Sequence, residues 1–248
     1  MRTDEPVRGN PPVYRTISAD EIIRTTARLV DRVRARFPDA GLARVADEIL
    51  AVARETDERC RLIRRPNLPL RLGVVLLIAL GIALGALVVR NVRMTEAVWD
   101  ASNFAQASES LLGDVVFLGA AIAFLVTLEN RVKRGRALAA INELRALAHI
   151  IDMHQLTKDP EMVLAHHAPT PASPARNMTP FELNRYLDYC SEMLALVSKI
   201  AALYVQSFPD SEALAAVDEI ESLTTELSQK IWQKIMILDR YTSSGAPA

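Results

Sequence analysis

The sequence predicts an all-α membrane protein, in which a two-helix transmembrane hairpin carries a cytosolic helical bundle formed by the helices before and after it. Three observations predict this fold class. Half of the 248 residues are apolar, yet only 5% are aromatic and only nine are glycine, a composition that favours helix. Two long apolar stretches lie in the middle of the chain. The segments on either side of them carry apolar residues at helical spacing.

The N-terminal part of the chain predicts a tail followed by a helical hairpin. Residues 1–15 contain three prolines and no apolar core, so we expect a disordered tail and not a secretory signal. We expect a cytosolic helical hairpin over residues 16–67. Ser18 stands three residues before Glu21, which is the spacing of a capping box. The sequence Phe37-Pro38-Asp39 separates two helix patterns, because proline ends a helix and aspartate can cap the next one.

The first predicted transmembrane helix covers residues 68–90. Its centre, residues 72–89, has eighteen residues without a charge or a strongly polar side chain. As a helix this centre is about 27 Å long, close to the thickness of the hydrocarbon layer. Gly81 and Gly85 form a GxxxG pair, which allows another helix to approach closely. We expect the pair to pack against residues 119–121 of the second span or against another copy of the chain.

The second predicted transmembrane helix covers residues 111–129 and follows an extracytosolic loop at 91–110. Its uncharged run has only fourteen residues, but without a partner span it would be an exposed apolar helix on the surface. Asp114 lies near its start, and an ionisable group at the edge of a span is a candidate functional residue. The alternative is that this carboxylate lies at headgroup depth, where water solvates it.

Basic residues predict the orientation of the two spans. They cluster before the first span and after the second, whereas residues 90–110 contain only two basic residues, Arg90 and Arg93, together with three acidic residues. The positive-inside rule therefore predicts that both termini are cytosolic and that the loop lies outside. We expect the membrane to be the plasma (inner) membrane. The same clusters suit anionic lipid headgroups, although setting the topology is a sufficient role for them. The clustered residues are Arg59, Arg61, Arg64, Arg65, Arg71, Arg131, Lys133, Arg134 and Arg136.

The C-terminal half predicts further cytosolic helices. We expect a helix extension and a short helix over residues 130–167, a proline-rich linker over 168–178, a helical hairpin over 179–241 and a tail over 242–248.

The predicted C-terminal hairpin resembles the first one. Thr179 and Glu182 have capping-box spacing, and Phe208-Pro209-Asp210 again separates two helix patterns. Apolar residues at alternating spacings of four and three predict a packing seam. This seam is a candidate interaction surface that closes within the chain or between chains, and its residues are Leu183, Leu187, Leu194, Val197 and Tyr204.

All four histidines lie within residues 149–167, mixed with acidic residues. The spacing lacks the i, i+4 pair of HExxH-type zinc sites, so we expect a capped helical corner without metal or cofactor. Two alternatives remain open: a site formed by His149, Asp152 and His166, and a pH-sensitive switch. The two cysteines, Cys60 and Cys190, have no CxxC spacing and predict neither a zinc site nor a disulfide framework.

Three functional hypotheses follow. A net charge of −1 does not favour a nucleic-acid partner, and the chain has no Gly-rich phosphate loop or GxSxG elbow. The first hypothesis is therefore a non-enzymatic, two-pass membrane protein, bound to lipid, whose helical bundle recruits a protein partner or another copy. The second is a homo-oligomeric pore or channel-type effector, and the third is an enzyme that uses the histidine segment. The layout is similar to that of the two-span effector domains of bacterial nucleotide-signalled defence systems, in helix arrangement alone.

Overall fold

The computed structural model describes residues 16–93, 101–160 and 178–243, and within these ranges all regular secondary structure is helical. The all-α prediction is confirmed for this part of the chain. Two helices are long and apolar enough to cross a membrane by length and composition. The chain divides into two compact units. We call Met1–Leu62 together with Ala137–Ala248 the bundle, and Ile63–Arg136 the apolar helix pair.

The first hairpin of the bundle consists of α1 (Ala19–Arg36) and α2 (Gly41–Arg64). The Ser18 hydroxyl accepts a hydrogen bond from the Glu21 N–H at 3.4 Å, so the predicted cap is present. The reciprocal bond of the predicted capping box is not formed, because the Glu21 carboxylate instead pairs with Arg24, one turn further along the helix.

The C-terminal hairpin consists of α6 (Pro180–Ser207) and α7 (Ser211–Ser243). Here the predicted capping box is confirmed. The Thr179 hydroxyl accepts from the Glu182 N–H at 3.2 Å, and the Glu182 carboxylate accepts from the Thr179 N–H at 2.8 Å. Pro180 takes the first helical position, where its missing N–H leaves no hydrogen bond unmade.

The two Phe-Pro-Asp turns are alike at the end of the first helix and differ at the start of the second. Phe37 and Phe208 each end a helix by donating an N–H to the carbonyl four residues earlier, at 2.7 and 2.8 Å. Asp210 then caps α7, since its carboxylate accepts from the N–H groups of Glu212 and Ala213. The prediction that Asp39 caps α2 is wrong. Helix α2 begins at Gly41, so the residue directly before the helix is Ala40 and not Asp39.

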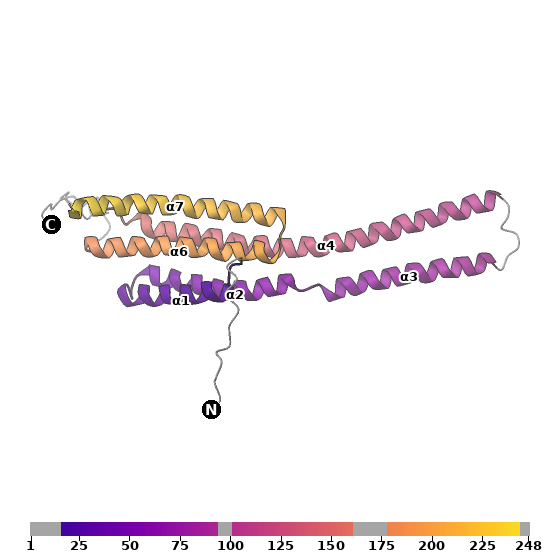
Figure 1. Ribbon diagram of the computed structural model, residues 1–248, viewed down its shortest axis with the longest axis horizontal. Coiled ribbons are helices and arrows are strands. Elements are labelled where there is room, and N and C mark those ends of the chain that lie inside the picture. Colours follow the sequence, from indigo (N-terminus) through magenta and orange to yellow (C-terminus); the bar gives the residue numbers. More distant parts are fainter. Residues whose placement is uncertain (1–15, 94–100, 161–177, 244–248) are drawn as a thin grey trace, which may run out of the picture. The chain divides into compact units, whose positions relative to one another are not determined.

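The core of the bundle is centred on α6. Figure 1 shows α6 and α7 side by side, and α1 also packs against α6. Helix α2 reaches the same core, because the Tyr204 hydroxyl donates to Thr56 Oγ1 at 3.2 Å. Three buried threonines donate their hydroxyls to the carbonyl four residues earlier, so burial leaves these groups paired. They are Thr26, Thr56 and Thr224.

The apolar helix pair contains α3 (Leu68–Arg93) and the first part of α4 (Ala101–Leu156). Helix α4 is a single helix of 56 residues, so the predicted second span and the predicted extension are continuous. The loop predicted at 91–110 is too long, because α3 extends to Arg93 and α4 already begins at Ala101. The apolar residues identify only the part of each helix that suits lipid. Both helices continue into the predicted loop, because its residues include no proline or glycine to disfavour a helix.

Two contacts show that α3 and the first part of α4 run antiparallel. The Asn67 N–H donates to Glu129 Oε1 at 3.2 Å, and Gly81 lies against the Leu118 side chain. The residue number therefore rises along α3 as it falls along α4. None of the residues in the most apolar 18-residue stretch of either helix is buried.

Candidate functional site

The predicted membrane-packing glycines lie in different surroundings. A Cβ atom added at Gly81 would lie 2.7 Å from Leu118 Cδ2, so this glycine permits the close approach of α3 and α4. A Cβ added at Gly85 would have no neighbour within 4 Å, and the same holds for Gly119. Gly81 therefore permits the contact between α3 and α4, whereas the face of α3 at Gly85 is open. The side chain of Asp114 lies outside the described set.

Residues 149–156 of the histidine segment form the end of α4. Among the described residues, no three His, Cys, Asp or Glu side chains are grouped to hold an ion. His149 is exposed, and Asp152 accepts a hydrogen bond from the Gln155 amide at 2.6 Å. His154 packs over Gly41, the first residue of α2. Burial lowers the pKa of His154, and the charges of Arg44 and Lys158 lower it further. Residues 161–177, with His166 and the predicted linker, lie outside the described ranges.

A buried polar junction joins the end of α4 to α7. Gln155 is only 2% exposed, and Lys234 Nζ donates both to its backbone oxygen at 2.9 Å and to its Oε1 at 2.7 Å. Burial lowers the pKa of Lys234, and the nearby carboxylates of Asp159 and Asp152 oppose this shift. Sequence reasoning missed this junction, because no local pattern relates residue 155 to residue 234.

A second polar network, partly exposed to solvent, joins α2 and α4 beside Tyr204 of α6. Arg59 pairs with Glu143 of α4 at 2.6 Å and with Glu55 of its own helix at 2.8 Å. Its hydrogen bond with Glu143 raises the pKa of Arg59, and burial raises the pKa of Tyr204 beside it. The sequence analysis treated Arg59 only as a topology signal, whereas the structure gives it a place in the packing of the bundle.

The predicted interaction seam is interior to the bundle. Its five side chains are each at most 1% exposed, because other helices of the same chain cover them. A partner could contact them only if the bundle opened. The heptad pattern therefore describes the core of one chain, and a surface for a partner must lie elsewhere. The buried residues are Leu183, Leu187, Leu194, Val197 and Tyr204.

Two grooves flank the outer face of α6. One, of about 840 Å³, lies between α6 and the start of α1, with Ile22 and Leu196 among its apolar residues. The other, of about 460 Å³, lies between α6 and α7. Its α6 wall consists of small residues with Lys199 at the edge, and Trp232 of α7, which is 62% exposed, lines it. The small wall residues on α6 are Ser191, Ala195 and Ser198.

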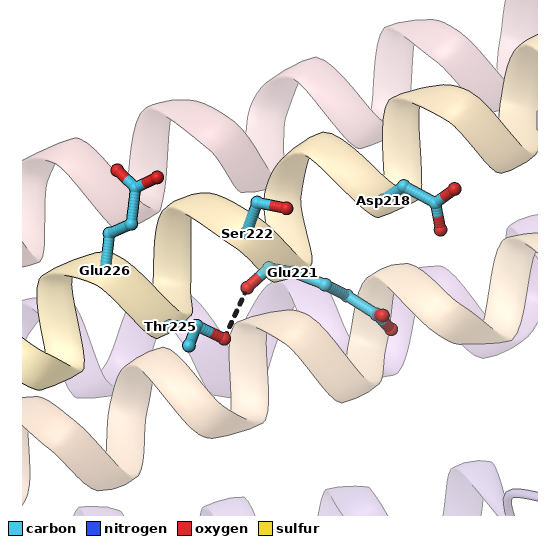
Figure 2. A pocket seen from close by; sticks show the side chains of 5 residues that line it. All are labelled: Asp218, Glu221, Ser222, Thr225 and Glu226. Atoms are coloured by element: carbon cyan, nitrogen blue, oxygen red, sulfur yellow. Dashed lines mark hydrogen bonds between the residues drawn. The ribbon is translucent and has the colours of Figure 1, made fainter.

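An acidic hollow of about 470 Å³ on the outside of α7 does not form a site. All five residues that line it belong to α7, and Figure 2 shows that their side chains diverge along the helix. The hydrogen bond drawn there runs from the Thr225 hydroxyl to the Glu221 carbonyl oxygen at 2.7 Å, which is an ordinary bond within a helix. Carboxylates that diverge do not share an ion.

Comparison with protein-family models, with curated proteins and with solved structures finds no match to this chain.

The Lys234–Gln155 junction yields the first prediction. Replacement Lys234→Met removes the donor to the buried Gln155 Oε1, while the Gln155 carbonyl keeps the Lys158 N–H, so we expect the free energy of unfolding to fall by about 1–3 kcal/mol. Lys230→Met, at an exposed position of the same helix, should change it by less than about 0.5 kcal/mol. Denaturant unfolding followed by circular dichroism in detergent measures both. Equal effects of the two variants would contradict the assignment.

Proposed function

We propose that this protein is a non-enzymatic, two-pass membrane protein that anchors a cytosolic helical bundle in the plasma membrane, where the bundle binds a protein partner as a scaffold. In this proposal α3 and the first part of α4 cross the bilayer, and both termini lie in the cytosol. The single observation that carries the proposal is the outward-facing apolar surface of α3.

The surface of α3 is what a lipid-facing helix requires. Between Arg71 and Arg90 the helix has no charge, and many of its large aliphatic side chains there are more than half exposed. In water such a surface would favour association or aggregation, whereas hydrocarbon solvates it. The most exposed of these side chains are Leu72, Val75, Leu76, Leu80, Ile82, Leu84 and Leu87.

The groove between α6 and α7 is the surface that best suits a protein partner. The small residues of its α6 wall allow a side chain or a helix to approach the backbone, and the indole of Trp232 projects beside them. Tryptophan is enriched among the residues that contribute most to binding at protein interfaces. The predicted seam is buried within the chain and is not accessible to a partner. We therefore propose this groove, in place of the seam, as the surface that binds a protein partner.

Membrane anchoring and orientation are tested together by single-cysteine labelling in cells. We expect Ser102→Cys, near the start of α4, to react with a membrane-impermeant maleimide from outside, and Ser243→Cys to react only after lysis. The native thiols give little background, because both are buried and burial raises the pKa of Cys190 to about 12. Labelling of Ser243→Cys in intact cells, or release of the protein by alkaline carbonate, would overturn the proposal.

The partner surface is tested by placing a photo-crosslinking amino acid at position 232. We expect a discrete crosslinked product in cells, because Trp232 lines the groove and is largely exposed. The matched control is position 214 on the same helix, where Leu214 is 48% exposed and lies outside the groove. Equal crosslinking from both positions, or none from position 232, would remove the groove from the proposal.

A second candidate function, a homo-oligomeric pore, is favoured by the open face of Gly85. Two spans cannot enclose a conduit, so a pore requires several copies that contact one another in the bilayer. Gly81 is occupied by Leu118, whereas Gly85 leaves room for a helix of another copy.

The two glycines supply a matched pair of variants for this candidate. If copies associate through the Gly85 face, Gly85→Leu should convert the oligomer to monomer in nanodiscs while leaving the α3–α4 contact intact. Gly81→Leu should instead disturb that contact within the chain, because the new side chain collides with Leu118. Mass measurement of the embedded protein, with ion flux in liposomes, checks both. A wild-type monomer without flux would exclude the pore.

A further inference from the structure

The end of the apolar helix pair where α3 begins carries a concentrated positive charge. Residues 63–71 and 129–136 contain seven cationic side chains and one acidic one, a net charge of +6 in a chain whose total is −1. These two segments meet in space, because Glu129 accepts the Asn67 N–H. The cationic residues are Arg64, Arg65, Arg71, Arg131, Lys133, Arg134 and Arg136.

The one acidic residue does not neutralise this cluster. The Glu129 carboxylate already contacts Lys133 Nζ at 2.8 Å, Arg71 Nε at 3.9 Å and the Asn67 N–H. It thereby joins the start of α3 to α4 and holds the two basic segments together. Three further arginines, Arg65, Arg131 and Arg136, are exposed and form no ion pair with any residue that the structure describes.

Exposed apolar side chains lie within these two basic segments or directly after them in the sequence. Leu68 is 71% exposed, Leu72 is 60% exposed, and Val132 stands exposed between Arg131 and Lys133. A soluble phosphate compound or a nucleic acid would use the charges but not the apolar neighbours. A phospholipid uses both, because its phosphate lies at headgroup depth and its acyl chains begin immediately below.

We propose that this basic cluster binds the headgroups of anionic phospholipids, with Arg65, Arg131 and Arg136 as residues that each contact a lipid phosphate. The inference rests on the proposed membrane anchoring and goes beyond it, because anchoring requires no selectivity among lipids. In this arrangement Glu129 is a positioning residue that keeps the two basic segments at one level. The consequence is a preference for anionic over zwitterionic lipid at this end of the helix pair.

The test compares lipid retention by the full-length protein. Wild-type protein is purified in detergent with equal amounts of chain-matched phosphatidylglycerol and phosphatidylcholine, and the bound lipids are counted by native mass spectrometry. We expect enrichment of phosphatidylglycerol and its loss in the triple variant Arg65→Gln, Arg131→Gln, Arg136→Gln, by about fivefold for each arginine removed. Because the protein is in micelles, altered topology in cells does not affect the result.

The control is a charge-matched triple variant, Arg28→Gln, Arg54→Gln, Arg90→Gln, whose arginines are exposed and lie outside the cluster. Equal losses in the two variants would overturn the inference, since they would reflect net charge alone. Displacement of the lipid by an equal concentration of glycerol phosphate would also overturn it, since the site would then recognise free phosphate.

Carbonate extraction of the same proteins from membranes separates this inference from the proposed function. If wild type and both variants stay in the membrane but the cluster variant retains the wild-type preference for phosphatidylglycerol, the lipid site is excluded and the anchoring stands. If wild type is released by carbonate, the proposed function fails, and the lipid site that rests on it is withdrawn.

Discussion

Burial of α6 is the constraint on which the bundle depends. Thirteen of its 28 residues are buried, which is more than one face of a helix, so α6 must be covered from several directions. Helices α1 and α7 pack against it, and α2 reaches it through Thr56 and Cys60. A helix that lost any of these neighbours would expose several large aliphatic or aromatic side chains.

Polar contacts then select one alignment of the helices among the many that apolar packing tolerates. The Gln206 amide pairs with both the N–H and the carbonyl of Ile17 and so holds the start of the first hairpin against the end of α6. Lys234 and Gln155 align α7 with α4 in the same way. No buried side-chain nitrogen or oxygen in the described residues lacks a partner. Burial of these groups therefore costs little and makes a shifted register unfavourable.

The two units are both helical, but they expose surfaces of opposite polarity. In the bundle most aliphatic side chains are buried and charged residues cover much of the outside, whereas many aliphatic side chains of the apolar helix pair are exposed. This contrast underlies the proposal of a membrane anchor, since one solvent cannot suit both surfaces. The clustering of arginines at one end of the helix pair adds a polar boundary to the apolar surface. A phospholipid layer likewise has charged headgroups directly next to hydrocarbon.

The helical class, several helix ends and the two apolar stretches could be predicted from the sequence, because these features depend on interactions within one turn or on composition. The Thr179 capping box and the turns after Phe37 and Phe208 are such local features. Three features could be seen only in the folded chain: the seam of α6 is buried within the chain, Gly81 is occupied while Gly85 is open, and Lys234 pairs with Gln155. These outcomes join residues that are tens to more than a hundred positions apart. A periodic pattern identifies which face of a helix is buried, but the residue that covers that face is set by packing in three dimensions.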